Sequence, residues 1–142
     1  TLDRNTRELQ QAVMAIRIMR LGSPREKGEG LRIGTVRRPP RGVPKAEFAR
    51  RDFYDVWLPQ LSPSAELVKA GQAAGEDDSA WRAFARRFRA EMAAGDAARL
   101  LDLLAALSHR TDLAVGCYCE DEARCHRSVL RELLAERGAA LL

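Results

Sequence analysis

The sequence contains no apolar run near the roughly 18 residues that a membrane-spanning helix needs, and it shows no signal-peptide pattern. From these absences we expect a cytoplasmic protein with no membrane association. With 142 residues, the chain is long enough for one domain with a substantial core. We assign that domain to residues 14–142 and treat residues 1–13 as an N-terminal extension.

Lysine is scarce, with only Lys27, Lys45 and Lys69, although the formal net charge is +4. Arginine therefore carries the excess positive charge, and arginine favours bidentate binding of phosphate or carboxylate. A codon bias toward arginine explains the same composition equally well. The charge alone thus indicates no particular partner.

Cysteine and histidine are also scarce, with three and two residues in the chain. An odd number of cysteines in a domain that needs no disulfide framework favours a reducing compartment, with thiols that are free or metal-bound. All three cysteines and His126 fall within the segment 117–126. This segment follows an apolar stretch and leads into a helical pattern, so it lies where a strand ends and a helix begins. Open α/β sheets place ligands at such positions, because strand ends and helix amides converge there.

The remaining pattern predicts strands at both ends of the chain and helices in the middle. Strands are expected at residues 16–21, 31–36 and 113–117, with a short extended segment at 53–57. Helices are expected at 45–51, 62–71, 78–92, 95–107 and 124–137. Ser62 is the expected N-cap of the second of these helices, and Asp78 or Ser79 that of the third. This order predicts a small three-layer α/β fold with a mostly parallel sheet.

Three chemistries fit the turn after the last strand. In the first, the amides that open the final helix bind an anion with the help of side chains from Arg124, His126, Arg127 and Ser128. In the second, Cys125 or Cys119 is a nucleophile, because a helix N-terminus and cationic neighbours lower the pKa of a thiol. His126 would then act as the acid or base.

The third chemistry is a metal site formed by Cys117, Cys119, Cys125 and His126. We favour it least, because zinc sites prefer spacings such as Cys-x-x-Cys, and Cys125 and His126 would point apart on a helix. A phosphatase-type Cys-x5-Arg loop fails on spacing, since Cys119 lies five residues before Arg124 and Cys117 seven. We therefore expect no metal at this turn.

A basic bend follows the second predicted strand and contains Arg37, Arg38 and Arg41. If that strand is the parallel neighbour of strand 113–117, the bend lies beside the start of the final helix and Tyr118. Several arginines around one helix N-terminus would form a pocket for a phosphate-bearing ligand such as a nucleotide or a nucleic-acid end. A solvated turn whose arginines pair with nearby carboxylates is the equal alternative.

The motifs in this chain resemble those of the YeaO-like domain-of-unknown-function 488 family. The similar segments are the basic bend 38–45, the helix start 61–67, the aromatic helix 81–92 and the turn 117–128 with its Cys-His-Arg-Ser sequence. The resemblance extends over residues 16–138. The chain departs from the YeaO branch at Pro39, where that branch has a tryptophan, and it keeps the Cys-His-Arg triplet that the branch often lacks. The resemblance implies an α/β fold of Rossmann-like layering and implies no particular reaction.

Two functional classes follow from these observations. The first is a small enzyme that acts on a phosphorylated or nucleotide-like substrate through Cys125 and His126. The second is a non-catalytic module that binds an anionic metabolite or nucleic acid. Both place a small anionic ligand at the start of the final helix. The sequence leaves the choice between them open.

Overall fold

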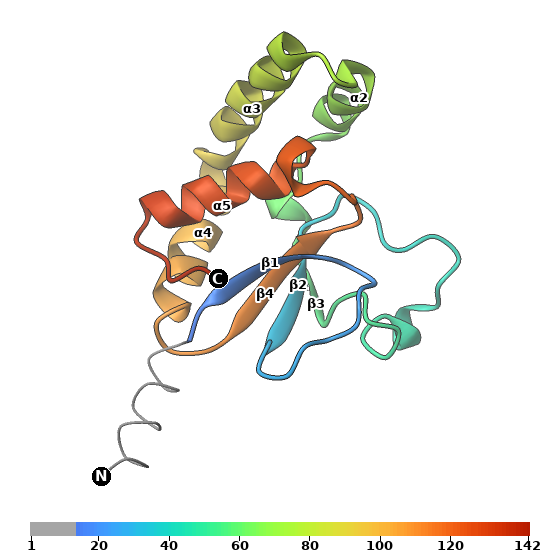
Figure 1. Cartoon of the computed structure of the whole chain (residues 1–142), viewed down its shortest axis with the longest axis vertical. Helices are drawn as coiled ribbons and strands as arrows, with labels where there is room; N and C mark the ends of the chain where they lie inside the picture. Colours follow the sequence, from blue (N-terminus) through green and yellow to red (C-terminus); the bar gives the residue numbers. More distant parts are fainter. Residues whose placement is uncertain (1–13) are drawn as a thin grey trace.

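The computed structural model describes residues 14–142 and contains a four-stranded sheet in which every neighbouring pair is parallel (Figure 1). The strands are β1 (Ile16–Arg20), β2 (Leu31–Gly34), β3 (Val56–Trp57) and β4 (Leu113–Cys117). Their order in the sheet is β1-β4-β2-β3. All residues of β4 are buried, as expected for an inner strand of a parallel sheet that reads as a continuous apolar run. The predicted small α/β fold with a parallel sheet is confirmed.

Helices cover one face of the sheet, and irregular segments cover the other (Figure 1). The α-helices within the described residues are α2 (Ala65–Ala74), α3 (Asp78–Met92), α4 (Gly95–Leu107) and α5 (His126–Glu136). The opposite layer consists of the loops after β1 and β2, including the 3-10 helix η1 (Lys45–Glu47). Two further 3-10 helices, η2 (Pro59–Leu61) and η3 (Glu122–Arg124), precede α2 and α5.

The core lies between the sheet and the helices. Alternate strand residues, among them Ile16, Ile33 and Val115, face the helices because strand side chains alternate between the two faces. From the helix side, Phe88 and Leu101 reach the same core and are fully buried. The predicted core stripe of α3 is confirmed, since Phe84, Phe88 and Met92 are buried and Trp81 packs against them.

The other face of the sheet buries an ion pair rather than an apolar cluster alone. Arg32 of β2 is completely buried and donates to both carboxylate oxygens of Glu29, at 2.6 and 3.0 Å. The Arg32 guanidinium also donates to the carbonyl oxygens of Ser23 and Asp52. Arg32 therefore ties both irregular loops to the sheet and fixes the layer that borders the ends of β2 and β4.

Several predicted boundaries are wrong by a few residues. The N-cap of α2 is Ser64, whose side chain accepts a hydrogen bond from the Leu67 amide, and Ser62 lies before the helix. The helix continues past Gly71 and ends at Gly75. The cap of α3 is Asp77. β2 ends two residues before the predicted Val36, and the segment after Lys45 forms only a short 3-10 helix. The predicted extension at residues 1–13 lies outside the described residues.

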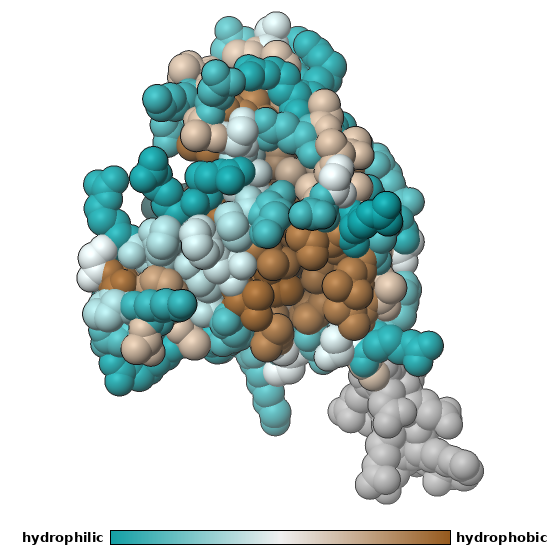
Figure 2. Space-filling view, turned by 180° about the vertical axis from the view of Figure 1, so that it is seen from behind, coloured by the Kyte–Doolittle hydropathy of each residue, from teal (hydrophilic) through white to brown (hydrophobic). Residues whose placement is uncertain are grey.

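One face carries a gathering of apolar side chains over α4 and the β3 edge of the sheet (Figure 2). Exposed apolar residues include Val56 of β3 and Leu103 of α4. Within residues 14–142, no helix is both long and apolar enough to cross a membrane.

Candidate functional site

The carboxyl ends of β2 and β4 lie side by side, as the basic-bend hypothesis requires. Ile33 pairs with Val115 and Gly34 with Gly116 in the parallel register. The Thr35 amide continues this pairing by donating to the Gly116 carbonyl oxygen at 2.9 Å. The segment that follows β2 and the segment that follows β4 therefore leave the sheet at the same edge, next to the start of α5.

Cys125 and His126 converge on one point, and this corrects the expectation that they would point apart. Cys125 is the N-cap of α5 and has an extended backbone, with φ −124° and ψ 151°. Its side chain therefore does not follow the helical spacing that separates adjacent residues. The short helix η3 ends directly before Cys125 and sets this geometry. The predicted helix 124–137 placed Cys125 inside the helix, whereas Cys125 is the extended residue before α5, and this hid the convergence.

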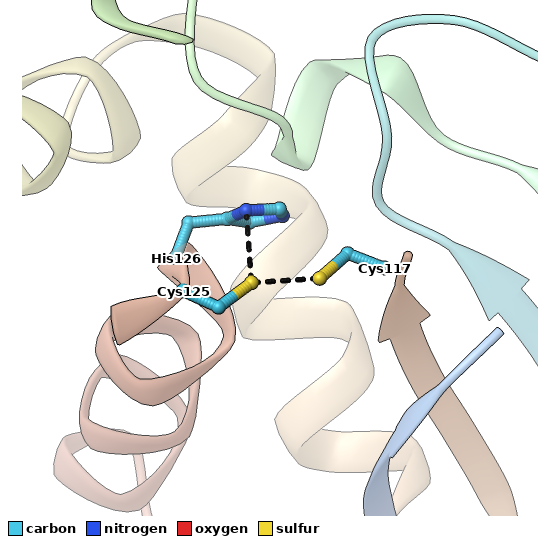
Figure 3. A group of neighbouring side chains, drawn as sticks. All are labelled: Cys117, Cys125 and His126. Carbon is cyan, nitrogen blue, oxygen red and sulfur yellow. Dashed lines mark hydrogen bonds between the residues drawn. The ribbon is translucent and has the colours of Figure 1, made fainter. Parts of the chain in front are cut away.

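The sulfur atoms of Cys117 and Cys125 lie 2.7 Å apart and are both buried (Figure 3). Cys117 comes from the end of β4 and Cys125 from the start of α5, so the contact joins the central strand to the final helix. The Cys125 sulfur also lies 3.6 Å from Nδ1 of His126 (Figure 3). Two thiols and an imidazole thus lie together in a buried position between the end of β4 and the start of α5.

His126 is held by a backbone carbonyl on β2's side of the site. Its Nε2 lies 2.7 Å from the carbonyl oxygen of Thr35. A carbonyl only accepts hydrogen bonds, so Nε2 carries the proton and Nδ1 presents its lone pair to Cys125. The Phe88 ring meets the imidazole edge-on, with centroids 5.5 Å apart. Burial lowers the pKa of His126 to about 4, although the Thr35 carbonyl opposes this shift. His126 is therefore a neutral ring at neutral pH.

Cys119 differs from the other two thiols because it is exposed. Its pKa is lowered, because the neighbouring thiols of Cys117 and Cys125 and the positive charge of Arg127 favour its charged form. The same interactions raise the pKa of Cys117, and burial raises it further. At Cys125, the interaction with Cys117 lowers the pKa, but the interaction with Cys119 and burial outweigh it, and the net shift is upward. The three residues, which we call the cysteine cluster, favour a single thiolate on Cys119.

The buried charge of Arg127 has no carboxylate partner among residues 14–142. Arg127 is only 3% exposed, and its guanidinium donates to the Cys119 carbonyl oxygen at 2.6 Å. Its Nε is buried and makes no hydrogen bond within the described chain. Burial lowers the pKa of Arg127, but the negative charge of the cysteine cluster outweighs this effect and the net shift is upward. A negative charge on the cysteine cluster would therefore favour the charged guanidinium.

Cys117, Cys125 and His126 bring one potential metal-ligand atom each to within 4.8 Å of one another. The set combines two sulfurs with an imidazole nitrogen, which suits zinc. Two sulfurs bound tetrahedrally to one zinc at about 2.3 Å would lie roughly 3.8 Å apart. The separation of 2.7 Å is shorter than this spacing and longer than a disulfide bond of about 2.05 Å.

Some of the predicted ligand-binding arginines bind other parts of the protein, and others have no such partner among residues 14–142. Arg37 donates to the carbonyl oxygens of Ser62 and Pro63, and Arg124 pairs with Asp78. The exposed Arg38 and Arg41 make no side-chain hydrogen bond or ion pair within residues 14–142. Arg38 nevertheless lies next to the site, because its carbonyl oxygen accepts from the Tyr118 hydroxyl at 3.1 Å.

Ser128 lies in the first turn of α5, and its hydroxyl donates to the Cys125 carbonyl oxygen at 2.9 Å. Thr35 is the residue that sequence reasoning missed. Its hydroxyl donates to the Gly116 carbonyl oxygen at 3.0 Å, and its own carbonyl orients His126. The available signal was its position directly after a predicted strand, at the edge where ligands bind.

The family model of the active DUF488-N3 subclade, DUF488-N3a, matches residues 16–138. The chain belongs to the DUF488-N3a family. This confirms the resemblance to the domain-of-unknown-function 488 family and places the whole cysteine cluster and the basic bend inside the DUF488-N3a domain. No curated protein and no solved structure matches the chain.

Proposed function

We propose that this protein is an enzyme that acts through a thiolate on Cys119 and takes an anionic, phosphate-bearing substrate. The observation that carries the proposal is the buried Arg127 guanidinium, which has no carboxylate partner within residues 14–142. A buried charge is costly unless an opposite charge compensates it. A thiolate in the cysteine cluster supplies that charge and is also the reactive form of cysteine.

Among the three thiols, Cys119 is the best candidate for the nucleophile. Cys125 and Cys117 are only 2% and 1% exposed, so a substrate cannot reach their sulfurs without local opening. Cys119 is exposed, and the direction of its pKa shift, to which the positive charge of Arg127 contributes, favours its charged form. Cys125 and His126, the catalytic pair that the sequence predicted, then have supporting roles, because the Cys125 sulfur is buried and lies 3.6 Å from Nδ1 of His126.

We propose a negatively charged substrate because exposed arginines lie in the segment next to Cys119. Arg38 and Arg41 are exposed in the segment after β2, and Tyr118, the residue before Cys119, donates to the Arg38 carbonyl oxygen. Arginines that are free of internal partners suit phosphate groups, which they bind through two parallel hydrogen bonds. The family description calls the subclade active, which favours an enzyme over a module that only binds.

Alkylation by iodoacetamide, followed at each cysteine by peptide mass spectrometry, tests the nucleophile. At neutral pH, we expect Cys119 to react at least about tenfold faster than Cys125. Between pH 5 and 9, the rate of Cys119 alkylation should rise with a midpoint below the ordinary thiol pKa of about 8.5. The Cys119→Ser variant should lose the fast phase, whereas Cys125→Ser should keep it. A midpoint of Cys119 at the ordinary value would overturn the proposal.

Inorganic phosphate serves as the probe for the anion site. It should slow the alkylation of Cys119 in the wild-type protein, and the Arg38→Ala/Arg41→Ala double variant should lose this protection. Arg110→Ala is the matched control, because Arg110 is exposed and precedes β4, at the opposite end of the strand. Phosphate protection without fast alkylation would favour the alternative function, a non-catalytic module that binds an anionic metabolite or nucleic acid.

A further inference from the structure

Three side chains with metal-binding atoms point toward one another between the end of β4 and the start of α5 (Figure 3). The sulfurs of Cys117 and Cys125 and a ring nitrogen of His126 all lie within 4.8 Å of one another, and all three residues are buried. One reason to expect no metal at this turn was that Cys125 and His126 would point apart. Because the structure brings them together, their adjacency in the sequence is no obstacle to a shared metal ion.

We propose that Cys117, Cys125 and His126 bind one zinc ion, with a water molecule in the fourth position of a tetrahedral site. Cysteine sulfur and histidine nitrogen are ligands that zinc prefers, and zinc sites with three protein ligands keep one position open. The inference goes beyond the proposed function, because Cys119 is not among the ligands and stays available as the nucleophile.

His126 is prepared for metal binding by its backbone partner. Its Nε2 lies 2.7 Å from the Thr35 carbonyl oxygen and carries the ring proton, so the lone pair of Nδ1 is free. Metal-binding histidines almost always donate their other ring nitrogen to a carboxylate, a backbone carbonyl or water, which fixes the tautomer and the ring orientation. The imidazole is also neutral at neutral pH, so no proton competes with the metal ion for Nδ1.

The separation between the imidazole and Cys125 already suits chelation. A sulfur at about 2.3 Å and a nitrogen at about 2.0–2.1 Å from one tetrahedral zinc ion lie roughly 3.6 Å apart. The Cys125 sulfur lies 3.6 Å from Nδ1 of His126. These two atoms can therefore bind one ion without moving relative to each other.

The two sulfurs must move apart slightly to bind the same ion. They are separated by 2.7 Å, whereas two zinc-bound sulfurs lie roughly 3.8 Å apart. A χ1 rotation of about 20° in each cysteine moves its sulfur by roughly 0.5 Å and stays within one rotamer well. Cys117 ends β4 and Cys125 precedes α5. Because only side chains rotate, the strand and the helix keep their hydrogen bonds.

The charge of the site is compatible with the buried Arg127. This guanidinium has no carboxylate partner among residues 14–142, so a further uncompensated positive charge beside it would be costly. The thiolates of Cys117 and Cys125 cancel the two charges of the zinc ion, and the bound group adds no net charge to the interior. Zinc binding must therefore release the protons of both thiols into solution.

Metal analysis of the full chain, purified under reducing conditions without a chelator or a histidine tag, tests the site. We expect one zinc ion per chain by inductively coupled plasma mass spectrometry. After removal of zinc by a chelator, Co²⁺ should produce a thiolate-to-cobalt charge-transfer band and the intense visible bands of tetrahedral cobalt. Absence of both zinc and these bands would overturn the inference, and stoichiometric copper or iron would overturn the assignment to zinc. The titration of free His126 is measured on the chelator-treated protein.

Variants test the individual ligands. Cys125→Ser and His126→Gln should each weaken zinc binding at least about tenfold, because loss of an outer partner alone already costs that much. His109→Gln is the matched control, since His109 is exposed, and it should keep its zinc. Unchanged zinc affinity in a folded Cys125→Ser variant would overturn the site. If circular dichroism shows that the ligand variants do not fold, the wild-type cobalt spectrum decides, because the charge-transfer band requires a sulfur ligand.

Cys119→Ser separates this inference from the proposed function. The variant should keep its zinc and lose the fast phase of alkylation. Loss of zinc would make Cys119 a fourth ligand, which overturns both the open position and the free nucleophile. If the wild-type protein binds zinc but Cys119 is alkylated slowly, the proposed function fails and the metal site stands. Fast alkylation of Cys119 in a protein that binds neither zinc nor cobalt would give the reverse result.

Discussion

The imidazole of His126 donates from Nε2 to the carbonyl oxygen of Thr35 at 2.7 Å, and this contact joins the first turn of α5 to the end of β2. It fixes the tautomer and directs Nδ1 toward Cys125. Because the ring is almost entirely buried, protonation would place an unsolvated positive charge beside Arg127. The neutral state of His126 is therefore built into the fold and gives the protein a pH-dependent stability.

We expect the free energy of unfolding to decrease as the pH falls from about 6.5 to about 4, the folded-state pKa of His126. The folded pKa is below that of the unfolded chain, so the unfolded state binds more protons in this window and is favoured by acid. His126→Gln should remove this slope in urea titrations at several pH values. His109→Gln, which changes an exposed histidine, should keep it. An identical slope in both variants would contradict the assignment.

The charge of Arg127 should control the reactivity of Cys119. In Arg127→Met we expect the alkylation midpoint of Cys119 to rise by about 1–3 pH units, because a nearby positive charge shifts a thiol by that amount. Arg127→Lys should shift it less, since the charge stays while the planar donors are lost. Equal midpoints in the wild type and Arg127→Met would show that the thiolate does not compensate this guanidinium.

The central strand and the position of the site were predictable from the sequence for simple physical reasons. β4 is an uninterrupted apolar run because a parallel inner strand is covered on both faces. The polar turn that follows it must then lie at the sheet edge. The adjacency of β2 and β4 was also a correct hypothesis, because consecutive helices between two strands allow a parallel crossover.

The errors arose where one residue type serves two purposes. Gly71 indicated a helix end, but it lies within α2, where a Cβ would come within 2.9 Å of the Phe84 ring. It is a site of close approach between α2 and α3, and Gly75, with φ +54°, ends the helix instead. The convergence of Cys125 and His126 was equally hidden, because it depends on one extended residue between η3 and α5.

The buried pair of Arg32 and Glu29 should be essential for stability. Burial raises the pKa of the Glu29 carboxyl, but hydrogen bonds from Arg32 and from the Glu26 amide lower it by more. The folded pKa is thus depressed, and the stabilisation is present above the ordinary value of 4.5 and lost as the pH falls through the folded value. Glu29→Gln leaves Arg32 buried without a charge partner and should cost about 3–5 kcal/mol.

Chemical denaturation at pH 7 measures this cost, and Glu66→Gln is the matched control because Glu66 is exposed on α2. Exposed ion pairs contribute at most about 1 kcal/mol to the free energy of unfolding. If Glu29→Gln lowers that free energy by less than this amount, the Arg32 guanidinium is accessible to water in solution.

Phe88 links the core of the helical layer to the site. It is completely buried in α3, and its ring meets the edge of the His126 imidazole with centroids 5.5 Å apart. Phe88→Ala should cost about 3–5 kcal/mol through loss of buried area and the cavity left behind. Phe88→Leu should cost less, yet it should admit water to the imidazole and raise the pKa of His126.

The His126 ring protons, followed by NMR between pH 3 and 8, report this shift directly, and the assigned ring signals of His109 serve as the internal reference. A folded Phe88→Leu variant in which His126 titrates as in the wild type would show that burial by this ring does not set its protonation.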